Sequence, residues 1–164
     1  MTERPHRRPT LDFVSDEIVA SHAEIHRIID ETLERLSRIA SEGPPNAHQV
    51  GELGRLLHEL SEQMRMHFQS EERSGFFRLV QHHLPDMKDE VDLLRREHGD
   101  IHKILVACLA CMNTSPAPNV VQLTEHIESL RHKLEPHEAT EDLLLTRLAA
   151  VTASLRGATP PTPR

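Results

Sequence analysis

Residues 98–105 read HGDIHKIL, a stretch that combines a helical apolar period with paired histidines. His98, Ile101 and Leu105 are separated by three and then four residues, which is typical of a helix that buries one stripe of side chains. His98 and His102 are four residues apart, so they share one face of that helix, about 6 Å apart along its axis. Burying an imidazole is unfavourable unless it is paired or binds a metal. The stretch therefore predicts a core helix that carries metal ligands.

The same pattern occurs three more times along the chain. Residues 22–29 (HAEIHRII) repeat residues 98–105, and residues 67–72 (HFQSEE) repeat residues 137–142 (HEATED). The four pairs spaced by four residues are His22/His26, His67/Glu71, His98/His102 and His137/Glu141. The chain therefore reads as two copies of one helical hairpin, related by approximate two-fold symmetry.

Proline and glycine divide the chain into four helical segments, with breaks at Gly43–Pro45, Leu84–Pro85 and Ser115–Pro118. Each segment alternates apolar spacings of three and four, and no segment shows the period of two expected of a strand. The pattern predicts an all-α fold, an antiparallel up-down-up-down four-helix bundle, over residues 15–155. Residues 1–14 are expected to form an N-terminal arm. Residues 156–164 are expected to be a disordered Pro/Thr-rich tail.

Capping residues mark where the helices should begin. Three pairs separated by three residues resemble capping boxes, and Ser15 is a candidate for the first helix. The three pairs are Asn46/Gln49, Asp86/Asp89 and Asn119/Gln122.

Composition excludes several classes of function. The net charge is −7 and the basic residues are scattered, so a nucleic-acid partner is not expected. The apolar runs are too short to cross a membrane and the N-terminus lacks a signal-peptide pattern, which predicts a cytoplasmic protein with no membrane partner. Cys108 and Cys111 lie within a helical pattern and are expected to be small core residues.

The four pairs should meet at one depth of the bundle, because they lie at similar distances from the turns that join their helices. Imidazole and carboxylate without thiolate suit iron, manganese or zinc. A structural zinc ion needs four ligands, whereas this site offers about eight, enough for two ions. The excess of histidine favours iron. Ferritin-like sites use Glu-x-x-His, which no helix here contains.

With these motifs, the chain resembles the hemerythrin and HHE cation-binding family over about residues 15 to 150. The resemblance implies two iron ions (Fe2+/Fe3+) joined by a bridging oxo or hydroxo group. It places His22 and His67 on one ion. It places His98, His102 and His137 on the other, with Glu71 and Glu141 as bridges. Asp142 is an alternative to Glu141, which we prefer because it mirrors Glu71 in the repeat.

His26 departs from the oxygen-carrying members of the family, and two interpretations remain open. As a sixth histidine ligand it would fill both octahedra and favour redox chemistry over O2 carriage. Alternatively, it orients a ligand by hydrogen bonding.

The expected function is to bind or respond to a small diatomic or peroxide ligand: O2, peroxide or nitric oxide. We assign no catalytic residue and no protein partner. The alternatives are a di-iron peroxidase, catalase-like or iron-oxidising enzyme, and an iron- or redox-sensing signalling module.

Overall fold

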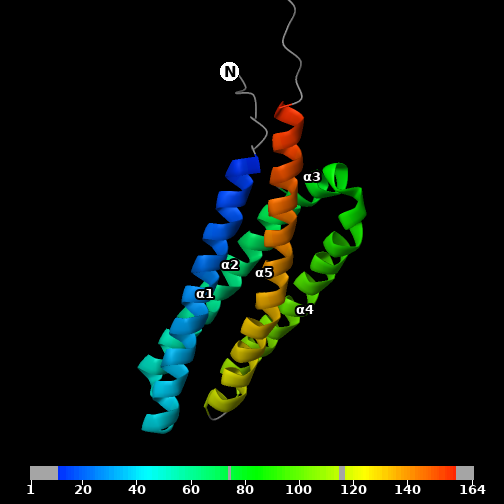
Figure 1. Cartoon of the computed structure of the whole chain (residues 1–164). Helices are drawn as coiled ribbons and strands as arrows, with labels where there is room; N and C mark the ends of the chain where they lie inside the picture. Colours follow the sequence, from blue (N-terminus) through cyan, green and yellow to red (C-terminus); the bar gives the residue numbers. More distant parts are fainter. Residues whose placement is uncertain (1–10, 74, 115–116, 158–164) are drawn as a thin grey trace, which may run out of the picture.

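The computed structural model describes residues 11–73, 75–114 and 117–157, and the described residues form an antiparallel helical bundle (Figure 1). Its long helices are α1 (Leu11–Glu42), α2 (Ala47–Arg73), α4 (Lys88–Met112) and α5 (Val120–Gly157). The connection from α2 to α4 contains the short helix α3 (Phe76–His83) and the 3-10 turn η1 (Pro85–Met87). The predicted all-α, four-helix bundle is confirmed.

The boundaries differ from the prediction in two places. The first helix begins at Leu11 rather than at Ser15, so Ser15 lies inside α1. The second segment is not continuous up to Leu84, because Gly75, with φ 90°, separates α2 from α3. A left-handed backbone of this kind is readily adopted only by glycine. The predicted arm and tail lie largely outside the described residues.

Two of the predicted caps form. Asn46 and Gln49 make a reciprocal capping box, in which each side chain accepts a hydrogen bond from the other residue's backbone N–H, at 2.9 and 3.0 Å. The backbone N–H of Gln122 donates to Asn119 Oδ1 at 3.1 Å. The prediction for Asp86 is wrong: α4 is preceded by Met87 and has no side-chain cap, because Asp86 lies within η1.

The core divides into two apolar clusters. The larger one fills the half of the bundle where α1 joins α2 and α4 joins α5, and includes Ile29, Leu60 and Leu130. The smaller one packs α3 against the outer ends of α1, α4 and α5, and includes Phe76 and Leu144. The polar cluster described below belongs to neither.

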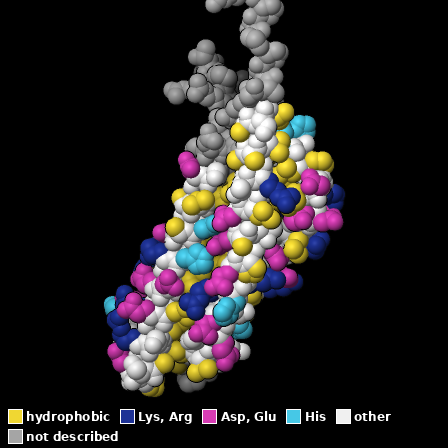
Figure 2. All heavy atoms as spheres, viewed as in Figure 1, with side chains coloured by type: hydrophobic (Ala, Val, Ile, Leu, Met, Phe, Trp, Pro, Cys, Tyr) yellow, Lys and Arg dark blue, Asp and Glu magenta, His cyan; other side chains and the backbone are white. Residues whose placement is uncertain are grey.

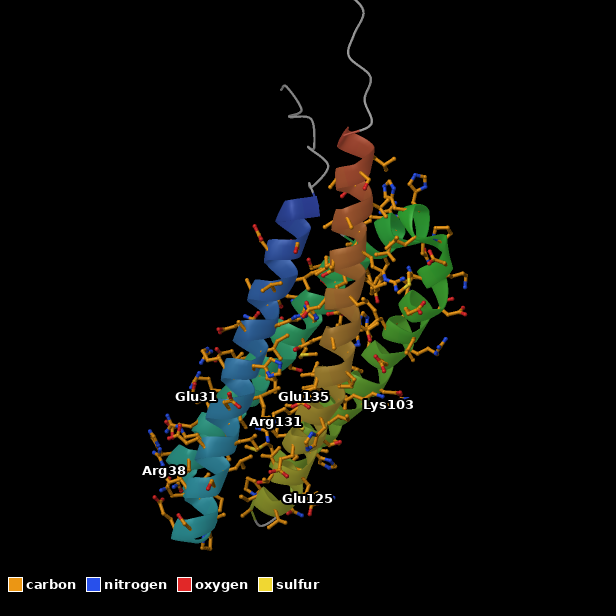
Figure 3. The ribbon with its side chains drawn as sticks, viewed as in Figure 1. Glu31, Arg38, Lys103, Glu125, Arg131 and Glu135 are labelled. Atoms are coloured by element: carbon orange, nitrogen blue, oxygen red, sulfur yellow. The ribbon has the colours of Figure 1, made fainter. Side chains whose placement is uncertain are left out.

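Cys108 and Cys111 lie inside the larger cluster and are not disulfide-bonded, which confirms that they are core residues. Burial raises the pKa of the Cys108 thiol to about 12. Charged residues such as Glu31, Arg38 and Lys103 project outward (Figure 3). Within the described ranges, no helix has the length and apolar character needed to cross a membrane.

Candidate metal centre

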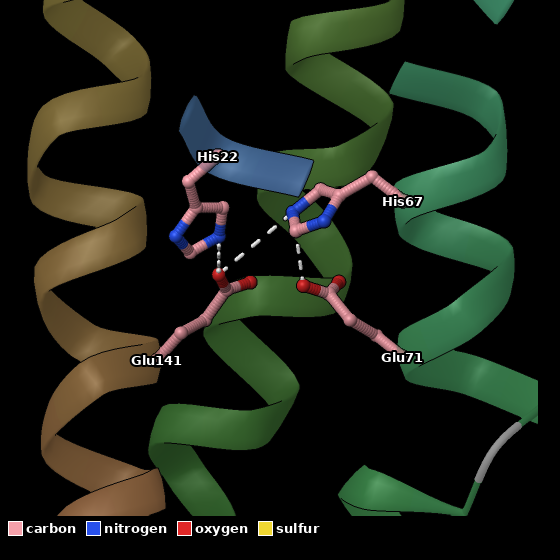
Figure 4. A group of neighbouring side chains, drawn as sticks. All are labelled: His22, His67, Glu71 and Glu141. Atoms are coloured by element: carbon pink, nitrogen blue, oxygen red, sulfur yellow. Dashed lines mark hydrogen bonds and ion pairs between the residues drawn. The ribbon is translucent and has the colours of Figure 1, made fainter. Parts of the chain in front are cut away.

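Four histidines and two glutamates from the four long helices converge between the apolar clusters. The donor atoms form two groups, each within 4.8 Å: His22, His67, Glu71 and Glu141, and Glu71, His98, His137 and Glu141. Both glutamate side chains belong to both groups and are 0% exposed. Figure 4 shows the first group, with both carboxylates pointing toward the imidazoles. The arrangement is a buried cluster suited to two metal ions.

On α2 and on α5, both residues of the i,i+4 pair belong to the cluster. The seam of α2 continues through Met64 to His67 and Glu71, so the two ligand candidates follow the leucine stripe in register. On α5, His137 and Glu141 follow Leu134 in the same way, and Pro136 lies within this helix, one residue before His137.

The i,i+4 pairs of α1 and α4 supply only one residue each. Ile25 and Ile101 occupy the inward direction and are both 0% exposed, so His22 and His98 enter the cluster whereas His26 and His102 lie beside the seam. His102 is exposed. His26 is partly exposed, and its Nε2 is 2.8 Å from Glu138 Oε2. Both histidines therefore lie outside the two groups of donor atoms.

Each carboxylate divides its oxygens between two histidines. Glu71 Oε1 lies 3.0 Å from His67 Nε2, and Glu71 Oε2 lies 2.9 Å from His98 Nε2. Glu141 Oε2 lies 2.9 Å from His22 Nε2, and Glu141 Oε1 lies 3.0 Å from His137 Nε2. Adjacent ligands of an octahedral ion at about 2.1 Å are about 3 Å apart. Each carboxylate thus lies between two histidines, at the spacing expected of neighbouring metal ligands.

Most of these inward atoms lack hydrogen bonds although they are close together. Within the described part of the chain, none of the following buried atoms has a hydrogen-bond partner: His67 Nδ1 and Nε2, Glu71 Oε1 and Oε2, His98 Nε2, His137 Nε2 and Glu141 Oε1. An unsatisfied buried polar group costs about 1–3 kcal/mol. Cations between these atoms would satisfy the inward-facing ones together, so the residues present fit a pair of metal ions.

The ionisation of the two carboxyls differs. Burial, together with the charge of Glu141, raises the pKa of Glu71 well above its ordinary value. Burial acts in the same direction on Glu141, but the close approach of the His137 and His22 imidazoles outweighs it and holds the pKa of Glu141 well below its ordinary value. Without metal, the cluster thus favours one neutral and one ionised carboxyl.

The pKa values of the four imidazoles also shift in opposite directions. Burial lowers the pKa of His67 to about 3, and burial together with the nearby His137 lowers the pKa of His98. Burial also disfavours the charged forms of His22 and His137, but the nearby Glu141 carboxylate outweighs it, and the pKa of each is raised.

The outward nitrogens of two histidines meet carboxylates that the sequence analysis did not single out. His137 Nδ1 lies 2.9 Å from Glu97 Oε2, and His98 Nδ1 lies 3.3 Å from Glu72 Oε1. Phe68 stacks on the His98 ring with centroids 3.9 Å apart. Glu72 and Glu97 each directly adjoin a ligand candidate in sequence, and this adjacency is the only signal that could have pointed to them.

Two surface clefts adjoin the cluster, each of about 260 Å³. One lies along α1 and α2, and its lining includes Ser21, Met66 and His67. The other lies between α2 and α4, and its lining includes Phe68 and His102. Asp142, the alternative to Glu141, is exposed and belongs to neither group.

Comparison with known protein families supports the assignment that the motifs suggested. The model of the hemerythrin HHE cation-binding domain matches residues 17–149, which include every residue of the cluster. Comparisons with curated proteins and with solved structures gave no match. The match covers most of the chain, and the chain therefore belongs to the hemerythrin HHE cation-binding family.

Proposed function

We propose that this protein holds two iron ions and uses them to bind or respond to O2, peroxide or nitric oxide. One ion would be held by His22 and His67, at what we call the His22/His67 position. The other would be held by His98 and His137, at the His98/His137 position. Glu71 and Glu141 would bridge the two.

The observation that carries this proposal is the set of buried donor atoms without hydrogen bonds. These unpaired nitrogen and oxygen atoms come from α2, α4 and α5 and face inward at mutual distances of 2.9 to 3.0 Å. A purely structural polar network would be expected to satisfy its members, because leaving them unpaired destabilises the fold. Metal ions supply the missing partner. The absence of thiolate and the four imidazoles favour iron over softer or harder ions.

The number of ligands supports an open centre. Each position receives two imidazole nitrogens and two carboxylate oxygens from the protein, whereas an octahedral ion has six ligands. The contact of His26 with Glu138 supports the interpretation that His26 acts outside the coordination sphere. Positions therefore remain for small exogenous ligands. When bound, the ions would supply reversible redox chemistry and binding of diatomic molecules.

The first experiment measures iron in protein purified from iron-supplied cells and in single variants. We expect about two ions per chain in the unmodified protein, and a loss in His67→Ala. His26→Ala and His102→Ala should retain both ions, because these side chains lie outside the cluster. Unmodified protein without iron would contradict the proposal.

The second experiment is an absorption spectrum of the iron-loaded protein with and without O2, azide and nitric oxide. An open centre predicts charge-transfer bands that shift when azide is added. Bands that stay unchanged with all three ligands would contradict open coordination positions and would favour the interpretation with six histidine ligands.

An enzymatic function is a second candidate, and one contact favours it. His26 and Glu138 form a partly exposed pair at 2.8 Å, one helical turn from His22 and next in sequence to His137. Such a pair can exchange protons with solvent and pass them toward the centre. Turnover of peroxide by the iron-loaded protein, lowered in His26→Ala but not in the exposed control His58→Ala, would support this candidate. Absence of turnover would exclude it.

A further inference from the structure

The outer edges of the four imidazoles differ between the two halves of the cluster. What this difference means for metal binding rests on the metal site proposed above. In each histidine Nε2 points inward to a carboxylate, so Nδ1 is the atom that can be oriented from outside. A carboxylate that accepts from the outer N–H fixes the ring and makes the inner nitrogen a stronger donor to a metal.

The His98/His137 position has such a partner on both rings. Glu97 Oε2 lies 2.9 Å from His137 Nδ1, and the side chain of Glu97 is only 15% exposed. Lys133 Nζ lies 3.9 Å from Glu97 Oε1, so the other oxygen of this carboxylate also has a charged partner. Glu72 provides the longer contact to His98, at 3.3 Å, from a more exposed side chain.

The His22/His67 position lacks these partners. Nδ1 of His67 is buried and finds no hydrogen-bond acceptor among the described residues. No described residue is seen to accept from Nδ1 of His22. Glu138 is the neighbouring carboxylate on this side, but its Oε2 is engaged by His26 at 2.8 Å. Among the residues that the structure describes, neither ring therefore has an outer carboxylate partner of the kind that His98 and His137 have.

We propose that Glu97, assisted by Glu72, is a positioning residue that makes the two metal positions unequal, so that the ions load in order. The His98/His137 position binds the first ion, and the His22/His67 position binds the second ion more weakly. Loss of a single outer carboxylate lowers metal affinity about 10- to 100-fold in comparable sites. The first ion should therefore bind at least about 10-fold more tightly than the second.

Ordered loading gives the protein a defined one-metal state. In that state both bridging glutamates already have one oxygen bound, which organises their other oxygens for the second ion. The His22/His67 ion is then the exchangeable one, so that limiting metal supply leaves the His98/His137 ion in place.

The test uses Co2+ as a spectroscopic and anomalous-scattering probe. Calorimetric titration of the metal-free protein should resolve two steps that differ at least about 10-fold in affinity. Crystals prepared with one equivalent of Co2+ should show the anomalous peak beside His98 and His137. A peak that is equal at both positions, or stronger beside His22 and His67, would overturn the order.

Variants assign the difference to Glu97. Glu97→Gln keeps an acceptor oxygen and should weaken the first step about 10-fold, whereas Glu97→Ala should weaken it up to about 100-fold. Glu72→Gln should have a smaller effect in the same direction. The matched control is Glu125→Gln, an exposed residue near the far end of the bundle (Figure 3). Unchanged first-step affinity in both Glu97 variants would refute the role of Glu97.

The outcomes separate this inference from the proposed function. If no Co2+ binds in the cluster, the metal site itself is wrong. If two equivalents bind there with equal affinity and without dependence on Glu97, the site stands and the ordered loading is wrong.

Discussion

Glu71 is the residue whose replacement should separate metal binding from folding most clearly. Its two oxygens face two different histidines, so it contributes to both proposed positions. Glu71→Gln preserves the size of the side chain but replaces one oxygen with an amide nitrogen that has no free electron pair for a metal. The variant should therefore lose one ligand at one position and negative charge at both.

The magnitude follows from linkage between binding and folding. At a free metal concentration 100-fold above the dissociation constant, one ion stabilises the folded state by about 2.7 kcal/mol, and two ions by about 5 kcal/mol. For a chain of this size each kcal/mol raises Tm by about 2–4 °C, so two ions should raise Tm by about 10–20 °C. Glu71→Gln should retain less than half of this increase.

The metal-free variant should not be less stable than the metal-free parent. Neither oxygen of Glu71 has a hydrogen-bond partner among the described residues, so none is lost on substitution. Burial raises the pKa of Glu71, so above its ordinary pKa the unfolded chain releases a proton that the folded protein retains, and stability falls as the pH rises. The amide cannot ionise. The variant should equal or exceed the parent, with the difference growing as the pH rises from the ordinary carboxyl pKa toward the raised one.

The assay is thermal unfolding followed by far-ultraviolet circular dichroism, with and without Fe2+ under anaerobic conditions. Glu128→Gln, an exposed position on α5, is the matched control and should respond to metal as the parent does. A full metal-dependent rise in Tm for Glu71→Gln would refute the bridging arrangement. A metal-free variant destabilised by more than about 2 kcal/mol would show that Glu71 supports the fold itself.

Three further predictions concern pH, the core and α5. Metal affinity, measured by calorimetry, should fall as the pH is lowered. The pKa values of His22 and His137 are raised above the ordinary 6.5, so these imidazoles begin to bind protons above that pH, and a metal must displace those protons. Affinity that does not change with pH would contradict this. Leu60→Ala should lower the free energy of unfolding in urea by about 2–5 kcal/mol. The control Val121→Ala replaces a side chain that is 71% exposed and should change this free energy by no more than about 0.5 kcal/mol. Equal effects of the two substitutions would place Leu60 outside the core. Pro136→Ala should raise that free energy by about 1 kcal/mol or more, because it restores a backbone donor inside α5; a decrease would show that proline stabilises the local geometry.

Figure 2 shows histidine and acidic side chains side by side along the seam between α1 and α5. The contact between His26 and Glu138 lies at this seam. The sequence alone identified His26 by its spacing from His22 but gave Glu138 no role, because α1 and α5 are distant in the chain. Contacts of this kind depend on which helix faces are adjacent, and only the packed bundle determines that.

Apolar periodicity determined most of the architecture. Alternating spacings of three and four define the buried stripe of each long helix, and the proline and glycine breaks define the turns. The level of His22 relative to His67, and of His98 relative to His137, follows from helix length alone, because residues at equal distances from the turn of an antiparallel hairpin lie side by side. The break at Gly75 was missed, because an isolated glycine does not reveal its backbone angle.

The sequence by itself determined that four helices carry polar residues to one depth of a buried core. It could not decide which member of each i,i+4 pair faces inward, because four residues advance a helix by slightly more than one turn, leaving the two side chains about 40° apart around the axis. The rotation of each helix in the bundle then selects between them. On α1 and α4, the burial of Ile25 and Ile101 turns His26 and His102 away from the cluster, and only packing against the neighbouring helices determines that rotation.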